Sequence, residues 1–171
     1  MIIERNRGRP ASWLLLSALV ILTDQASKAF IAGRYMEFEF TRLLPVLDIT
    51  CMHNVGAAFS FLASASGWQR WLFIGLAGVV SVGITFWLVR LPRGTHGLLA
   101  AGLALVLGGA LGNVIDRIRL GYVIDFIHFH WERAYFPAFN VADSAITIGA
   151  ACLLLDALFE AKRKTDANIP G

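Results

Sequence analysis

The sequence predicts an all-α polytopic membrane protein with four transmembrane helices in one integral membrane domain, residues 1–171. Of its 171 residues, 57% are hydrophobic and 16% are charged, and the mean hydropathy is +0.63. A soluble domain is about 45–50% apolar and about 25% charged. Four separate segments are long enough to cross a hydrocarbon core, which takes about 20 helical residues. The excess of apolar residues is therefore expected to face lipid.

The four helices are expected at about residues 11–31, 68–89, 97–118 and 141–159. The second is the clearest, because it has no charged side chain through most of its length. The other three carry polar residues toward one end. The first is expected to be a retained helix rather than a cleaved leader, because no small-residue cleavage signature follows it.

The third helix carries Gly108 and Gly112, which are four residues apart and lie on one helix face. Small residues at this spacing let two helix backbones approach closely in a membrane. We expect this face to be a packing surface.

Basic residues predict the orientation. An even number of helices places both termini on one side, together with the loop between the second and third helices. Lysine and arginine concentrate there and acidic residues lie mostly opposite, although the bias is moderate because the opposite side also holds arginines. By the positive-inside rule, the termini are expected in the cytoplasm and residues of about 32–67 and 119–140 outside. The basic residues on the termini side are Arg5, Arg7, Arg9, Arg90, Arg93, Lys162, Arg163 and Lys164.

The basic residues form short clusters beside apolar runs, so the sequence pI near 9.2 does not indicate a nucleic-acid partner. In the outer segments, alternation of apolar with polar residues at 35–40, and the stretch 49–52, predict short β-strands. Residues 57–62 predict a short interfacial helix with its aromatic side chains toward lipid. The aromatic residues around 131–137 are typical of a membrane interface.

Polar and ionisable residues within the apolar segments lie near one plane. A charged side chain at the centre of a membrane helix costs about 2.5–3.5 kcal/mol on insertion scales, so such residues usually have a function or a partner. Ten of them fall at or beside the expected outer helix ends, which predicts a polar site at the outer face. They are Asp24, Gln25 and Lys28, then Asn113, Asp116 and Arg117, then Asp125, and finally Asn140, Asp143 and Ser144.

A purely structural role stays open for part of this set. Asp24 and Lys28 are one helical turn apart and can pair on one face, and Asp116 with Arg117 can neutralise each other. Asp125 and Asp143 differ, because neither has a basic residue one turn away. Two acids in apolar company that meet can share one proton. One can then take a proton from water while the other polarises a peptide carbonyl, which is the chemistry of an aspartic peptidase.

Other chemistries fit less well. His128 and His130 share a face of an extended segment, but no third ligand at a usual spacing accompanies them, so no metal is expected. The serines have no evident histidine partner. Two alternatives remain: a small proton-coupled carrier, since membrane carboxylates also serve ion paths, and a non-enzymatic assembly factor. A carrier usually has repeated halves and a site near the midplane, whereas this sequence has no repeat and its acids cluster at one face.

Five short motifs, in order across nearly the whole chain, resemble those of the bacterial lipoprotein signal peptidases (signal peptidase II). Each is weak alone, but the set is specific, and no motif position departs from the family pattern. The motifs are DQASK at 24–28, HNVGAAFS at 53–60, GGALGNVIDR at 108–117, YVIDF at 122–126 and FNVADS at 139–144.

The resemblance implies an aspartic endopeptidase of the bacterial inner membrane that acts at its periplasmic face on diacylglyceryl-modified prolipoproteins, cutting just before the lipidated cysteine. It implies four transmembrane helices with a small extracytoplasmic β-cradle and a short surface helix, and no cofactor. The expected partners are lipid-modified prolipoproteins and membrane lipids. Asp125 and Asp143 match the catalytic pair. Eight further residues are expected to bind substrate or support the site: Asp24, Lys28, Asn54, Gly56, Asn113, Asp116, Arg117 and Asn140.

Overall fold

A computed structural model describes residues 10–56, 67–92, 97–132 and 134–167. In this part of the chain four helices are long and apolar enough to cross a membrane, which confirms that part of the predicted fold class. A single 3-10 turn precedes the first helix. The elements are η1 (Pro10–Trp13), α1 (Leu14–Ala32), α2 (Trp68–Arg90), α3 (Gly97–Arg119) and α4 (Val141–Ala167).

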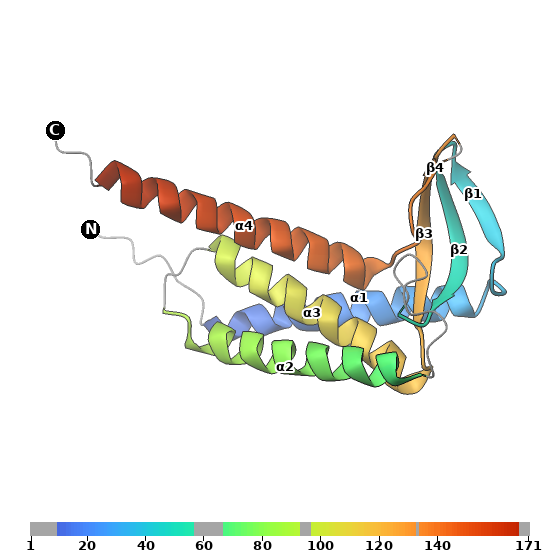
Figure 1. Ribbon diagram of the computed structural model, residues 1–171, viewed down its shortest axis with the longest axis horizontal. Helices are drawn as coiled ribbons and strands as arrows, with labels where there is room; N and C mark the ends of the chain where they lie inside the picture. The colour runs from blue at the N-terminus through green and yellow to red at the C-terminus, as the bar shows by residue number, and fades with distance from the viewer. Residues whose placement is uncertain (1–9, 57–66, 93–96, 133, 168–171) are drawn as a thin grey trace.

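Helix α3 is the centre of the bundle and packs against each of the other three helices (Figure 1). Glycines let the backbones approach. A Cβ atom added at Gly102 would lie 2.9 Å from the carbonyl oxygen of Gly149 on α4, and one at Gly108 would lie 2.8 Å from that of Ser17 on α1. Because lipid is as apolar as leucine, such close contacts contribute much of the attraction between membrane helices. The glycine face expected on the third helix thus packs against its neighbours.

Helix α4 continues past the expected end near Phe159 to Ala167. Its later turns expose large apolar side chains, among them Leu154, Leu158 and Phe159. Figure 1 shows this part of α4 diverging from the other helices toward the end where both termini lie. An apolar helix surface of this kind is suited to contact with lipid.

A four-stranded antiparallel sheet stands across the other end of the bundle (Figure 1). Ile31 near the end of α1 packs into an apolar cluster with Cys51, Ile124 and Phe126 of the sheet, so the sheet is fixed to the helices. The strands are β1 (Phe40–Leu44), β2 (Leu47–Asn54), β3 (Val123–Trp131) and β4 (Ala134–Tyr135), in the order β1-β2-β3-β4.

The strand expected at residues 35–40 is wrong except at its last residue. The segment before Phe40 turns from α1 into the sheet, and Phe38 has a positive φ of 67°. The backbone N–H of Tyr35 donates to the carbonyl oxygen of Ile31, and that of Met36 to the Glu39 carboxylate. These local bonds form a turn, which is joined to β2 by the Phe38 N–H donating to the Cys51 carbonyl oxygen at 2.8 Å. The strand expected at residues 49–52 lies within β2, and the interfacial helix expected at 57–62 lies outside the described residues.

The pairing of β2 with β3 contains an irregularity beside the site. Ile49 pairs with Ile127 and Met52 with Asp125, so β2 has one more residue than β3 between these pairs. A β-bulge of this kind bends the strand and redirects side chains, and bulges are common next to active sites. Here the bulge lies between Ile49 and Met52, just before Asn54. The Asn54 side chain contacts Asp125.

Candidate active site

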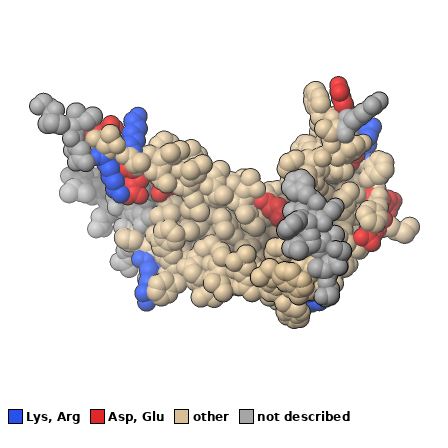
Figure 2. Space-filling model, in the orientation of Figure 1, with Lys and Arg blue, Asp and Glu red and all other residues tan. Residues whose placement is uncertain are grey.

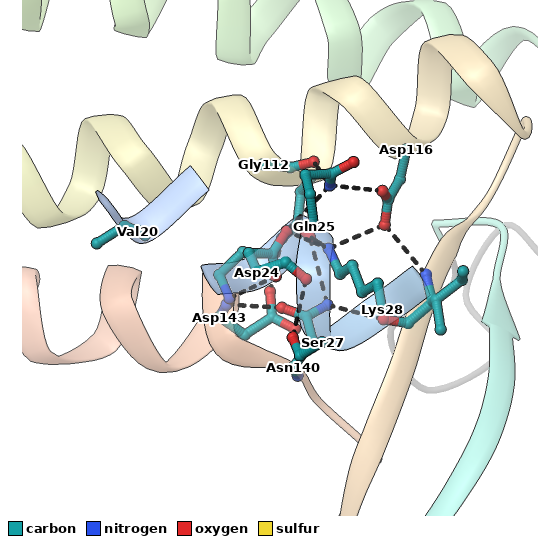
Figure 3. A network of polar contacts seen from close by, with 12 residues as sticks. Val20, Asp24, Gln25, Ser27, Lys28, Gly112, Asp116, Asn140 and Asp143 are labelled. Atoms are coloured by element: carbon teal, nitrogen blue, oxygen red, sulfur yellow. Dashed lines mark hydrogen bonds and ion pairs between the residues drawn. The ribbon is translucent and has the colours of Figure 1, made fainter. Parts of the chain in front are cut away.

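Polar side chains from α1, α3, β2, β3 and the start of α4 meet where the helices end beneath the sheet; Figure 3 shows the part of this network around Lys28. Nearly all of the residues predicted from the sequence belong to this one network. Because the elements are far apart in the chain, only the tertiary structure brings the residues together. The linked residues are Asp24, Gln25, Lys28, Asn54, Asn113, Asp116, Asp125, Asn140 and Asp143.

Asp143 is held at the start of α4 by a reciprocal pair of bonds with Asn140. The Asp143 backbone N–H donates to Asn140 Oδ1 at 2.9 Å, and the Asn140 backbone N–H donates to Asp143 Oδ2 at 3.2 Å. This is a capping box, in which two otherwise unpaired helix-end donors are satisfied. The other Asp143 oxygen accepts from Asn113 Nδ2 at 2.8 Å. An anionic side chain in the first turn of a helix is favoured by the helix dipole.

Asp125 lies on β3 in a drier setting and is only 3% exposed. Its Oδ1 accepts from Asn140 Nδ2 at 2.6 Å and its Oδ2 from Asn54 Nδ2 at 2.9 Å. Burial raises the pKa of Asp125 to about 7; the Asn54 hydrogen bond works against this rise and the nearby charge of Asp143 adds to it. Near neutral pH this carboxyl is therefore divided between its protonated and ionised forms.

Asn140 joins the two acids. Its side-chain nitrogen donates to Asp125, while its side-chain oxygen and backbone nitrogen both bond to Asp143. The residue is fully buried. Two carboxyl groups from different elements therefore contact the same residue, which is the convergence that shared-proton chemistry requires.

Behind the two acids lies a buried ion cluster. The Lys28 ammonium lies 2.8 Å from Asp24 Oδ2 and 2.9 Å from Asp116 Oδ2, and Gln25 Nε2 donates to Asp116 Oδ1 at 2.8 Å. The expected Asp24–Lys28 pair is thus present. The expected Asp116–Arg117 pair is wrong, because Asp116 pairs with Lys28 of another helix; adjacent residues on a helix do not face each other.

Arg117 lies at the edge of the network. Its guanidinium stacks over the Phe73 ring at 5.2 Å, and Nη1 donates to the Asn113 carbonyl oxygen at 3.3 Å. Its buried Nε has no hydrogen-bond partner among the described residues. A buried guanidinium N–H without an acceptor is costly, so this group is suited to an incoming carbonyl or ester oxygen.

Gly56 supports Asn54 through the backbone. The Gly56 N–H donates to Asn54 Oδ1 at 2.8 Å, which leaves the Asn54 amide nitrogen directed at Asp125. Gly56 has a φ of 104°, and a Cβ atom here would lie 2.7 Å from Phe73 Cε2. Both the backbone conformation and the space therefore require glycine.

A cleft of about 430 Å³ opens beside Asp143 and is otherwise mostly apolar. Figure 2 shows a concave face between the helices and the sheet. An apolar surface next to an acid suits a substrate that carries hydrocarbon chains. The cleft is lined by Phe136, Phe139, Asp143, Ser144, Thr147 and Ile148.

Three contributors to the site were not among the predicted site residues. Gln25 bridges Asp24 and Asp116, and Phe73 faces both Arg117 and Gly56. Phe139 lines the cleft beside Asp143. Gln25 carried a signal, as a polar residue in an apolar helix, but an aromatic residue in an apolar segment carries none.

Comparison with known proteins gives a consistent result. The family model described as signal peptidase (SPase) II matches residues 16–159. A protein of Pseudomonas fluorescens named lipoprotein signal peptidase is 56% identical over 158 residues, covering 91% of this chain and 92% of the relative. One of the same name from Acinetobacter baylyi is 53% identical over 153 residues, covering 89% and 84%.

A solved structure also matches. It is described as a bacterial membrane enzyme and superposes with a TM-score of 0.80 at 28% identity, covering 94% of this chain and 95% of that one. A second, under the same description, gives a TM-score of 0.76 over 86% of this chain.

Proposed function

Because the chain belongs to the signal peptidase II family, as its five motifs predicted, we propose that it removes the signal peptide from diacylglyceryl-modified prolipoproteins by aspartic endopeptidase chemistry, with Asp125 and Asp143 as the catalytic pair. The cut falls just before the lipidated cysteine. The protein is a multi-pass membrane peptidase of a bacterium.

One observation carries the choice of residues. Asp125 and Asp143 lie on different elements, yet both bond to Asn140. The remaining buried acids of the network, Asp24 and Asp116, are both paired with Lys28, so each carboxylate already has a cation as its partner. Asp125 and Asp143, the proposed catalytic dyad, contact amide and backbone N–H donors instead. They are therefore the pair that can exchange a proton.

The environments of the two acids favour different roles. Asp143 lies at a helix N-terminus, where an anion is stabilised, so it acts as the base that takes a proton from water. Asp125 has a pKa of about 7 because it is buried, so it acts as the acid that donates a proton to the carbonyl oxygen. The water oxygen forms a bond to the carbonyl carbon. As the carbon–nitrogen bond breaks, the proton that Asp143 took passes to the leaving amine. The carbonyl reforms and the proton that Asp125 gave to its oxygen returns to Asp125, so both carboxyls regain their starting forms.

The other residues position these groups or bind substrate. Asn54, Asn113 and Asn140 hold the two carboxyls by hydrogen bonds. Arg117 has a buried Nε without a partner among the described residues, which favours contact with a substrate carbonyl or ester oxygen. The apolar cleft beside Asp143 favours an acyl chain of the substrate.

The site belongs, in this proposal, to the periplasmic side, with both termini in the cytoplasm. The start of α1 and the last turns of α4 lie toward the end of the bundle opposite the sheet (Figure 1). Figure 2 displays lysine and arginine at that end beside acidic side chains, and some basic side chains near the sheet as well, so the bias that the positive-inside rule uses is moderate. The sheet then forms a cradle over the outer helix ends. The surface helix at residues 57–62 stays a prediction from the sequence.

The dyad is tested by cleavage of a lipid-modified precursor peptide by purified protein in lipid nanodiscs. Asp125→Asn and Asp143→Asn should each lower kcat by roughly 10³–10⁴-fold, the upper range for loss of general acid–base catalysis, with thermal stability near that of the wild type. Asp48→Asn is the matched control, because Asp48 is also a buried acid but pairs with Arg42 on the sheet. Full activity in either dyad variant would remove that residue from the mechanism.

A further inference from the structure

Lys28 makes three short polar contacts. Its ammonium lies 2.8 Å from Asp24 Oδ2, 2.9 Å from Asp116 Oδ2 and 2.9 Å from Asn113 Oδ1. An ammonium has three hydrogens to donate and no acceptor, so these contacts use all of its donors. The side chain is only 2% exposed. Lys28 is therefore held in one place, with one donor committed to Asn113.

That donor makes the shortest contact to the oxygen of the Asn113 amide and helps to set which way the amide faces. The oxygen and nitrogen of an asparagine amide have nearly the same shape, so hydrogen-bond partners set the orientation. Here Oδ1 accepts from Lys28 at 2.9 Å and from Asn140 Nδ2 at 3.3 Å, and Nδ2 donates to Asp143 Oδ1 at 2.8 Å. A flipped amide would present its NH2 to an ammonium and its oxygen to a carboxylate, and both contacts would be repulsive.

The two acids that hold Lys28 are themselves tied to the elements that carry the dyad. Asp24 Oδ1 accepts the backbone N–H of Ala142 at 2.9 Å, and Ala142 directly precedes Asp143. Asp116 Oδ2 accepts the backbone N–H of Ile124 at 3.3 Å, and Ile124 directly precedes Asp125. The position of the ammonium is thus set relative to both catalytic carboxyls.

We propose that Lys28 is a positioning residue for peptide hydrolysis: its ammonium fixes the Asn113 amide so that the NH2 group points at Asp143. This inference rests on the proposed function, because it assigns Lys28 to the same reaction. Lys28 does not touch the reacting atoms in this account. It acts through Asn113, which holds Asp143 in the orientation that receives a proton from water.

Ser17 separates this role from a structural one. Its side chain is buried on the same helix and donates to the Ala104 carbonyl oxygen of α3 at 2.8 Å, so it also joins α1 to α3. Among the described residues no hydrogen bond joins it to Lys28 or Asn113. A substitution at Ser17 therefore weakens the contact between the two helices while the amide orientation is kept.

The test measures kcat, KM and the melting temperature of five variants on a lipid-modified precursor. Lys28→Gln should lower kcat roughly 100-fold, the loss that misplaced catalytic groups typically cause, and change KM less than about threefold. Asn113→Asp should lose at least as much and also melt lower, because the new carboxylate still accepts from Lys28 but turns an oxygen toward Asp143. Ser17→Ala should melt lower yet keep kcat within about threefold.

The fourth variant is Asn113→Ala, and the fifth combines it with Lys28→Gln. If Lys28 acts through Asn113, the lysine change should lower kcat less than about threefold once the amide is gone, whereas independent roles would multiply. A multiplicative loss, full kcat in Asn113→Asp, or losses at Lys28 and Ser17 that simply follow melting temperature would each overturn the proposal. Failure of the proposed function itself is distinct, because then wild-type protein would not cleave or Asp143→Asn would still cleave.

Discussion

The two ends of the helix bundle are held together by different interactions. The end near the chain termini has an apolar core, and α1 and α3 are joined there by a neutral hydrogen bond from Ser17 Oγ to the Ala104 carbonyl oxygen at 2.8 Å. The end beneath the sheet is joined by ion pairs and amide bonds centred on Lys28 and Asn140. The apolar core consists of Leu88, Leu91, Ala100, Leu103 and Ala104.

The contrast separates what holds the helices from what performs the reaction. Glycine contacts between α3 and α4 occur at both ends, at Gly102 and at Gly109, so close packing alone does not mark the site. A buried charge cluster is a weak source of stability, because desolvation offsets much of its attraction. The charges beneath the sheet are therefore better explained by the positions they impose on Asp125 and Asp143.

A matched pair of glycine substitutions tests this separation with the largest effect. Gly109→Ala places a methyl group against the carbonyl oxygen of Ala142, next to Asp143, and Gly102→Ala places one against Gly149, farther along α4. Each should destabilise the protein by about 1–3 kcal/mol through overpacking. Only Gly109→Ala should also lower kcat, by roughly 100-fold.

Thermal melts and single-turnover cleavage in nanodiscs would measure the two effects. Correcting each rate for the folded fraction makes them comparable. Equal losses of kcat in the two variants would mean that the two ends of the bundle are not functionally distinct.

A pH profile gives the next effect in size. Asp125 must be protonated to act as the acid, and burial raises its pKa to about 7. Activity should therefore fall above pH 7, by about tenfold for each further pH unit, as the proton is lost. The measurement is kcat/KM between pH 5 and 9. A flat profile to pH 9 would contradict the role given to Asp125.

The raised pKa of Asp125 also makes the stability of the fold depend on pH. Asp125 has an ordinary pKa of 3.8 that rises to about 7 in the fold, so the folded state binds the proton more tightly than the unfolded state. This contribution to stability is present below pH 4 and is lost as the pH rises to 7. Asp125→Asn lacks this titration. As the pH rises from 4 to 7, the melting temperature of the variant should therefore increase relative to that of the wild type.

The smallest expected effect concerns Asn54. Its hydrogen bond to Asp125 lowers the pKa of that carboxyl and opposes the effect of burial. Asn54→Ala should therefore move the alkaline limb of activity to higher pH, by about one unit, since one unit corresponds to 1.36 kcal/mol and a net hydrogen bond is of that size. Movement of the limb to lower pH in kcat/KM profiles would show that Asn54 acts differently.

The sequence predicted the helices well and the sheet poorly. Long apolar runs are a strong signal, because an apolar span of about 20 residues fits few structures other than a transmembrane helix. Alternation over residues 35–40 is a weak signal, and the local turn bonds around Phe38 prevailed. Strand β3 was not predicted, although its β-branched and aromatic residues favour a strand; one buried acid and two histidines interrupt its apolar pattern.

The sequence by itself determined that four segments enter lipid and that the polar residues lie near one plane, because both follow from hydropathy and chain order. It did not determine the partners within that plane. Asp116 has Arg117 beside it in the chain but pairs with Lys28, and Asn140 contacts both Asp125 and Asp143. These partners depend on how each helix is rotated and how closely glycines let the helices approach, which only tertiary packing decides.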